Sequence, residues 1–320
     1  MDYAKHVDAI WTAFCSTLPL DLQHEARHLA RELGLVPLPD VPWSEIFKNE
    51  VTLAAPALFA AAMPSVPGQT VVTAVTAHML AVIDAFALDR VLDGQATGNP
   101  QTMRLLEFVR AGRDQALCEL TGGKKSPYLD AEYEAVCAIN TERLLLRHNV
   151  ALSFSDYSGL SLAKQAVAFP ASLALARAAG WDSRRQRAVQ HVLRGIVLGL
   201  QFQDDAVDWE DDWRKGGAWA VNLSREHNRL AGPATSGKPD IARLRREVHD
   251  SGVLAVMMNL ARLRYREAQR LATSLGATQL ATWAQEQEVT AAEMAERESH
   301  SAGYVVRAHQ LSSWALEVFG

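Results

Sequence analysis

Cysteine is scarce in this sequence of 320 residues. Cys15, Cys118 and Cys137 are odd in number, and their spacing matches no disulfide or metal-binding pattern, so we expect free thiols in a reducing compartment. The N-terminal stretch 1–13 carries acidic residues and has no apolar core of the kind found in a secretory signal. These features predict a cytoplasmic protein.

Long apolar runs and an excess of positive charge are also missing. The longest uninterrupted apolar stretch, 53–63, contains Pro56 and is too short to cross a bilayer, so we expect no integral membrane segment. Lysine and arginine total 32 against 37 acidic residues, and this formal net charge of −5 argues against a nucleic-acid partner. A negatively charged protein that binds an anionic substrate needs local positive charge, which metal ions often supply.

Strand-like alternation is absent, and apolar residues recur at helical spacing almost throughout. The segments 69–88 and 161–179 are apolar on all sides, so other helices must surround them. No linker or repeat divides the chain, which predicts an all-α, single-domain bundle of about ten or more helices over residues 1–320. The predicted helices are 20–34, 43–63, 69–93, 101–121, 128–149, 155–179, 183–213, 240–275, 277–300 and 303–318.

A dense acidic cluster follows an apolar run near the end of the predicted helix 183–213. Asp204 and Asp208 share a face, because residues four apart on a helix lie about 40° apart, and Asp212 extends that face. Like charges at this spacing repel one another, and carboxylates at a helix C-terminus oppose the helix dipole. Mg²⁺ commonly takes one or two carboxylates together with phosphate oxygens. The cluster therefore predicts a metal site, with a solvated acidic face as the alternative.

A second acidic pair, Asp89 and Asp93, shares a face near the end of the predicted helix 69–93. Alone, this pair is explained equally well as a solvated one. Two acidic pairs on two long apolar helices could instead hold metal ions between them. In this respect the sequence resembles the isoprenoid synthase superfamily of trans-prenyltransferases and class I terpenoid synthases. There, two aspartate-rich motifs face each other across a helical bundle with a central active-site cavity, and they hold three Mg²⁺ ions that bind a substrate diphosphate.

The resemblance is carried by residues in a consistent order. The segment 200–208, with Gln201 before the paired aspartates, resembles the second motif, and Lys164 falls where the superfamily places a diphosphate-binding lysine. Lys215 precedes two glycines, as in the lysine-glycine turn after that motif, whereas Arg90 stands where the first motif has an aspartate. The resemblance implies catalytic roles for Asp89, Asp93, Asp204 and Asp208, metal binding by these four and Asp205, and substrate contacts for Lys164, Gln201 and Lys215. Phe86 and Phe169 are further candidates for substrate contact, because aromatic faces stabilise a carbocation, with plain core packing as the alternative.

Chain-elongating members of the superfamily use further cations for a second diphosphate, and the corresponding segments 55–64 and 94–101 contain none. The resemblance therefore favours a class I terpene synthase, a lyase that ionises an allylic prenyl diphosphate with Mg²⁺ and cyclises the carbocation. The alternative is a prenyltransferase that joins the prenyl group to an acceptor other than, or less readily including, isopentenyl diphosphate. A non-catalytic partner subunit or a helical scaffold is a different class, against which the intact second motif argues. A homodimer is possible, since dimers are common in the resembled superfamily.

Overall fold

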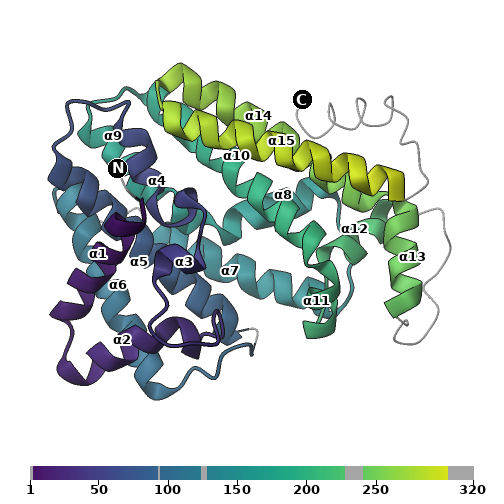
Figure 1. Ribbon diagram of the computed structural model, residues 1–320, viewed down its shortest axis with the longest axis horizontal. Helices are drawn as coiled ribbons and strands as arrows, with labels where there is room; N and C mark the ends of the chain where they lie inside the picture. The colour runs from purple at the N-terminus through teal and green to yellow at the C-terminus, as the bar shows by residue number, and fades with distance from the viewer. Residues whose placement is uncertain (1–2, 93, 124–127, 228–240, 302–320) are drawn as a thin grey trace. The chain divides into compact units, whose positions relative to one another are not determined.

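A computed structural model of the chain describes residues 3–92, 94–123, 128–227 and 241–301 (Figure 1). These residues form fifteen α-helices and one short 3₁₀ turn, and no strand occurs among them. The prediction of an all-α fold with ten or more helices is confirmed. The helices are α1 (Tyr3–Thr17), α2 (Leu20–Glu32), α3 (Trp43–Ile46), α4 (Glu50–Ala60), α5 (Gly68–Leu92), α6 (Pro100–Thr121), α7 (Tyr128–Arg147), α8 (Phe154–Lys164), α9 (Pro170–Ala178), α10 (Ser183–Val207), α11 (Trp209–Lys215), α12 (Trp219–His227), α13 (Ile241–Ser251), α14 (Val253–Leu275) and α15 (Thr278–Ser301).

Several predicted helices are divided by local backbone features. The predicted helix 43–63 is two helices, because the Asn49 side chain accepts a hydrogen bond from the Val51 N–H and caps a new helix there. The predicted helix 155–179 is interrupted before Pro170, which begins α9 because a first-turn residue needs no hydrogen-bonded N–H.

One later prediction and two omissions are also corrected, and one further prediction is not tested. The predicted helix 240–275 is divided at Gly252, whose φ of +69° is the left-handed conformation that ends many helices. The helices α1 and α12 did not stand out in the sequence. The predicted helix 303–318 lies outside the described residues.

The chain divides into two compact units, and the single-domain expectation stays a prediction. Unit 1 comprises the described residues of 1–135, 166–190 and 272–280, and unit 2 comprises those of 136–165, 191–271 and 281–320.

The core helix of unit 1 is α5. It contacts α4, α6 and α9, and about half of its residues are buried. By length and composition alone α5 could cross a membrane, but two thirds of its most apolar stretch is buried inside the protein. Its apolar character is therefore explained by packing within unit 1.

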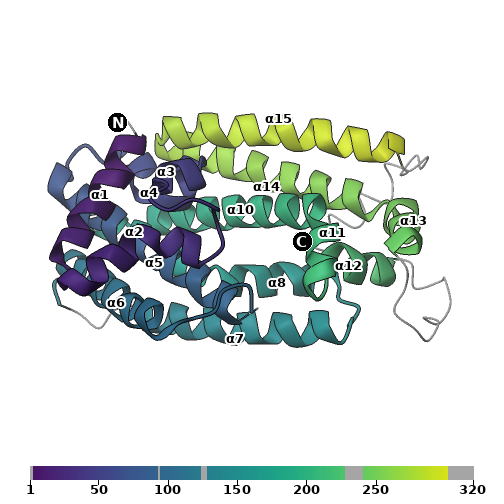
Figure 2. The same cartoon turned by 60° about the horizontal axis from the view of Figure 1, so that its bottom comes forward.

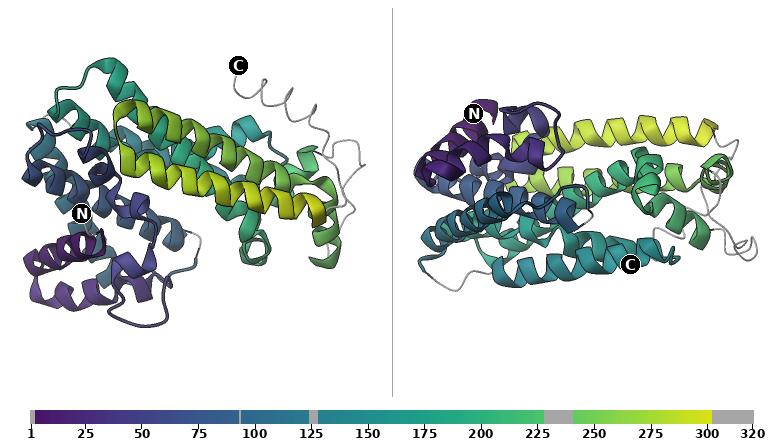
Figure 3. Two further views of the ribbon diagram at one scale, coloured as in Figure 1. Left: turned by 45° about the horizontal axis from the view of Figure 1, so that its top comes forward. Right: turned by 90° about the horizontal axis from the view of Figure 1, so that it is seen from below.

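Unit 2 is built on long helices that approach one another closely. At Gly199 of α10, an added Cβ would lie 2.5 Å from the ring of Tyr265 on α14, and at Gly195 it would lie 2.9 Å from the carbonyl oxygen of Arg264. The Tyr265 ring in turn packs edge-on against Trp283 of α15, and Figures 2 and 3 show α14 and α15 side by side. The two glycines therefore set the distance between α10 and α14.

This packing predicts opposite effects of the same substitution at two helical glycines. Gly199→Ala should lower the free energy of unfolding by roughly 1–3 kcal/mol, because the new methyl group overlaps a buried ring. Gly159→Ala is the matched control on α8: its added Cβ meets nothing within 4 Å, so the better helix propensity of alanine should stabilise by about 0.5–1 kcal/mol. Urea unfolding of both variants measures the difference, and equal midpoints would contradict the close packing of α10 on α14.

Candidate functional site

The aspartate face predicted from the sequence lies where α10 meets α11. The predicted helix 183–213 is divided at Asp208, whose φ and ψ of −98° and 8° leave the helical region and allow Trp209 to enter the core. Backbone hydrogen bonds nevertheless join Asp208 N to Asp204 O at 2.9 Å and Asp212 N to Asp208 O at 3.0 Å. These bonds preserve the four-residue spacing of the three aspartates across the break.

Asp205 points away from this face into the core of unit 2. Its side chain is buried, and its Oδ2 accepts hydrogen bonds from the Tyr157 hydroxyl of α8 and, at 3.0 Å, from Gln201 Nε2. Gln201 Oε1 accepts a hydrogen bond from Gln165 Nε2 at 2.8 Å, which extends the network. Burial raises the pKa of Asp205 to about 8, although the hydrogen bonds from Tyr157 and Gln201 oppose that shift. Metal ligation by Asp205 and substrate binding by Gln201 stay predictions; here both side chains join α8 to α10.

Lys164 is the last residue of α8, and a buried carboxylate holds it. Its Nζ donates to Glu142 Oε2 of α7 at 2.6 Å, while Glu142 Oε1 accepts a hydrogen bond from Trp219 Nε1 of α12 at 2.7 Å. Burial raises the pKa values of Asp204 and Asp212, and the Lys164 charge opposes this rise. The predicted diphosphate-binding lysine therefore lies within electrostatic reach of the aspartate face.

The lysine-glycine turn lies at the end of α11. Lys215 is half exposed, and its Nζ is 3.8 Å from Asp212 Oδ1. Gly216 has a φ of +148°, which favours glycine, and a Cβ on Gly217 would lie 2.9 Å from the Cβ of Leu146. One glycine is needed for the backbone conformation and the other for close approach to α7, and together they fix the start of α12.

The aspartate face is short of positive charge. Although Asp204 reaches solvent, loss of hydration raises its pKa, and the Asp208 charge adds to that shift while Lys164 and Lys215 oppose it. Burial is also the main reason why the pKa of Asp212 is raised to about 6, and the charges of Asp204 and Asp208 add to this rise. The neighbouring Glu210 differs. Arg245 of α13 donates from Nε to Glu210 Oε1 and from Nη2 to Glu210 Oε2, each at 2.5 Å, and these bonds lower the pKa of Glu210.

These residues fit a divalent cation that is shared with a phosphate ligand. Among the described residues, no three side chains of the metal-binding types come close enough together to hold an ion by themselves. Mg²⁺ does not require such a cluster, because it usually takes one or two carboxylates and completes its shell with water and phosphate oxygens. Asp204 and Asp208 are the residues that would supply the carboxylate oxygens for this arrangement.

The first acidic motif belongs to unit 1. Asp89 is half-buried on α5, and Asp93 lies outside the described residues. Arg90 donates from Nε to Leu33 O and from Nη2 to Gly34 O at 3.1 Å, so it caps the end of α2. This structural role explains an arginine at a position where the resembled superfamily has an aspartate. Metal binding by Asp89 and Asp93 stays a prediction.

The two predicted aromatic contacts also belong to unit 1. Phe86 on α5 is 38% exposed, and its ring centroid lies 4.9 Å from that of Phe47. Phe169 is half-buried and precedes the first residue of α9. Their roles as substrate contacts stay predictions, and so does the central active-site cavity.

An ion-pair network in unit 1 did not stand out in the sequence. Asp84 of α5 is buried and accepts hydrogen bonds from Arg110 Nε at 3.0 Å and from Arg113 Nη1 at 3.1 Å. Arg113 is 2% exposed and also binds Asp114 and Glu132. Two arginines of α6 are thus neutralised by acidic partners, and the network joins α5 to α6.

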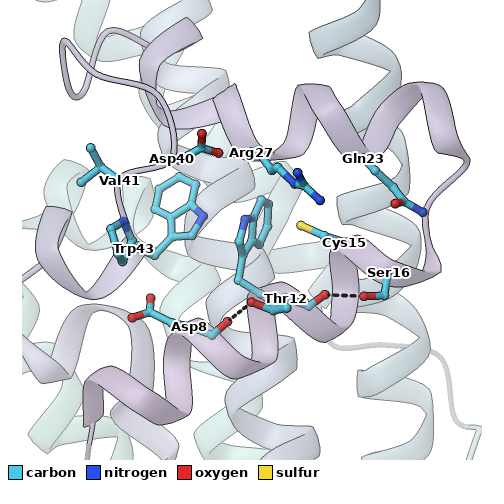
Figure 4. Close-up of a pocket in the computed structure, with 11 residues that line it drawn as sticks. Asp8, Thr12, Cys15, Ser16, Gln23, Arg27, Asp40, Val41 and Trp43 are labelled. Atoms are coloured by element: carbon cyan, nitrogen blue, oxygen red, sulfur yellow. Dashed lines mark hydrogen bonds between the residues drawn. The ribbon is translucent and has the colours of Figure 1, made fainter.

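A cavity of about 250 Å³ lies in unit 1, between α1, α2 and the segment before α3 (Figure 4). Trp11 and Trp43 form part of its wall with ring centroids 5.4 Å apart, and Arg27 lies beside Cys15. Burial raises the pKa of the Cys15 thiol to about 11. None of the site residues predicted from the sequence lines this cavity.

Neither a protein-family model nor a curated protein sequence matches the chain, whereas solved structures do. The chain matches a polyprenyl synthetase from Streptomyces coelicolor A3(2) with a TM-score of 0.68 and 16% identity, over 89% of this chain and 97% of that one. It matches the polyprenyl synthase ISP_B from Roseobacter denitrificans with a TM-score of 0.62 and 16% identity, over 92% and 95% of the two chains. A polyprenyl synthase from Caulobacter crescentus CB15, complexed with calcium and isoprenyl diphosphate, matches with a TM-score of 0.56 and 19% identity, over 88% and 97%. The chain therefore has the polyprenyl synthase fold, as the resemblance implied.

The aspartate face predicts that the wild type and an Asp212→Asn variant differ in stability in a pH-dependent way when EDTA removes metal ions. The pKa of Asp212 is raised in the folded protein to about 6 from an ordinary 3.8, so ionisation of this carboxyl destabilises the fold as pH rises through that window. Asp212→Asn should therefore melt roughly 1–3 °C above the wild type at neutral pH, a small shift because solvent partly screens the side chain. The difference should shrink as pH falls from about 6 towards 3.8 and vanish only below that value, where Asp212 is protonated in both states.

Asp211→Asn is the matched control, because Asp211 is exposed and paired with Arg214. Its melting temperature should stay at or slightly below that of the wild type. If Asp212→Asn melts at a lower temperature than the wild type at neutral pH, the aspartate face is not short of positive charge.

Proposed function

We propose that this protein is a metal-dependent enzyme that ionises an allylic prenyl diphosphate and transfers the prenyl group to an acceptor. The observation that carries the proposal is the face formed by Asp204, Asp208 and Asp212, with Lys164 and Lys215 beside it, in a polyprenyl synthase fold. Carboxylates short of positive charge and lysines next to them suit a ligand that brings both metal ions and phosphate oxygens.

The reaction breaks the bond between the allylic carbon and the diphosphate oxygen, so negative charge develops on the leaving group. Lys164 and Lys215, whose charges act on the aspartate face, would donate hydrogen bonds to that charge. Mg²⁺ ions held by Asp204 and Asp208 would act as Lewis acids and neutralise the diphosphate. Asp205, Tyr157 and Gln201 keep α10 fixed against α8, so that the aspartates need not reorganise during the reaction.

Transfer is favoured over cyclisation because the three similar structures are all polyprenyl synthases. An acceptor other than isopentenyl diphosphate is favoured because unit 1 lacks cations at the segments that would bind a second diphosphate. The segments 55–64 and 94–101 contain no lysine or arginine. Nearby in the sequence, Arg90 binds backbone carbonyls, and Arg110 and Arg113 are paired with acids. A second diphosphate needs lysine or arginine partners, and arginine suits it best because it binds phosphate oxygens bidentately. Cyclisation remains the second candidate, since the same lack of cations suits an enzyme with a single substrate.

The proposal is tested by incubating the protein with geranyl, farnesyl or geranylgeranyl diphosphate and Mg²⁺, with and without acceptors, and analysing the products. We expect pyrophosphate release that EDTA abolishes and that an added nucleophilic acceptor accelerates, with no longer prenyl diphosphate formed from isopentenyl diphosphate. Asp208→Asn should lower the rate at least about 100-fold, because it removes one charged ligand, whereas Asp211→Asn should leave it within about threefold.

Three other outcomes would change the assignment. A cyclic or rearranged product from the allylic substrate alone would favour the cyclase. Efficient elongation with isopentenyl diphosphate would show that the acceptor site is cationic after all. Full turnover in EDTA would contradict the metal-dependent mechanism itself.

A further inference from the structure

Glu142 is a buried carboxylate at the meeting point of three helices in unit 2. Both of its oxygens are engaged: Oε2 lies 2.6 Å from Lys164 Nζ of α8, and Oε1 lies 2.7 Å from Trp219 Nε1 of α12. One turn further along α7, Leu146 packs against Gly217 just before α12. The two helices that flank the aspartate face are thus both fixed to α7 at this point.

The direction in which the Lys164 ammonium group points determines whether it pairs with the carboxylates of the aspartate face. Lysine is a point charge on a flexible stem, so its position depends on which acceptor holds it. Burial raises the pKa values of Asp204 and Asp212, and the Lys164 charge opposes that rise at both carboxylates. If Glu142 did not hold Lys164, the ammonium group would be attracted to the carboxylates on which its charge acts, and these include Asp204, a proposed metal ligand.

An ammonium ion paired with Asp204 would compete directly with Mg²⁺ for the same oxygens. A carboxylate that forms a short salt bridge is a weaker metal ligand, because the cation already neutralises its charge. Glu142 prevents this competition by supplying a separate counter-charge. An ammonium group carries three N–H donors, so the hydrogen bond to Glu142 does not prevent Lys164 from donating to phosphate oxygens as well.

We propose that Glu142 is a positioning residue that holds Lys164 off the aspartate face, so that Asp204 and Asp208 stay available to metal ions while Lys164 stays available to a diphosphate. The inference rests on the proposed function and assigns a role in it to a residue of α7.

The test measures binding rather than turnover. Isothermal titration calorimetry with inorganic pyrophosphate at increasing Mg²⁺ gives the Mg²⁺ concentration that supports half-maximal binding. Glu142→Gln keeps the shape of the side chain and removes its charge, so this concentration should rise about tenfold as Lys164 turns to the aspartates. In a Lys164→Met background, the same substitution should change it by less than about twofold, because no ammonium group is left to compete.

Two further variants separate positioning from stability. Glu142→Asp keeps the charge, and its Mg²⁺ requirement should lie within about threefold of the wild type even if the fold is destabilised. Glu210→Gln is the matched control, because it removes another ion-paired glutamate of unit 2, one that binds Arg245 instead of Lys164. It should leave the Mg²⁺ requirement within about twofold of the wild type.

An equal rise with and without Lys164 would show a merely structural role for Glu142, and no rise in Glu142→Gln would also overturn the inference. Either result leaves the proposed function intact as long as the wild type binds pyrophosphate with Mg²⁺. A wild type that fails to bind pyrophosphate at any Mg²⁺ concentration would overturn the proposed function, and this inference with it.

Discussion

A carboxylate removed from water has to be held by hydrogen-bond donors, and at Asp205 this requirement determines how α10 meets α8. Tyr157 and Gln201 both donate to its Oδ2, so the side chain of Asp205 faces the core. Asp204 points about 100° away from Asp205 around the helix, and Asp208 lies at its end, and both of these side chains are exposed. One buried hydrogen-bonded group thereby divides a run of aspartates into a structural part and an exposed part.

The exposed aspartates carry more negative charge than the nearby lysines neutralise. Burial raises the pKa values of Asp204 and Asp212, the Asp208 charge adds to the rise, and Lys164 and Lys215 oppose it in part. The other acidic side chains near α11 are not in this condition, since Glu210 and Asp211 are paired with arginines. The difference separates carboxylates that stabilise the helix end from carboxylates that suit a ligand. It also explains why a bond between Glu142 and Lys164 matters, because an ammonium group without that bond would pair with the aspartates that lack counter-charge.

Helical periodicity and the spacing of aspartates sufficed to predict the all-α fold and the face at the end of α10. The breaks at Asn49, Pro170, Asp208 and Gly252 were missed or misplaced because each depends on one capping or turn residue inside a periodic pattern. The partners of Asp205, Lys164 and Asp84 could not be predicted, since they come from other helices at distances along the chain that no local pattern encodes. Arg90 could be identified as a departure from the resembled motif, but the carbonyls that it binds could not.

A crystal structure of the protein with Mg²⁺ and inorganic pyrophosphate would test most directly whether the aspartate face is a diphosphate site. The account predicts Mg²⁺ bound directly by Asp204 and Asp208 at about 2.1 Å, with Lys164 and Lys215 donating to pyrophosphate oxygens and Asp205 still held by Tyr157. Pyrophosphate bound at another place, or both carboxylates more than about 6 Å from every metal ion, would contradict it.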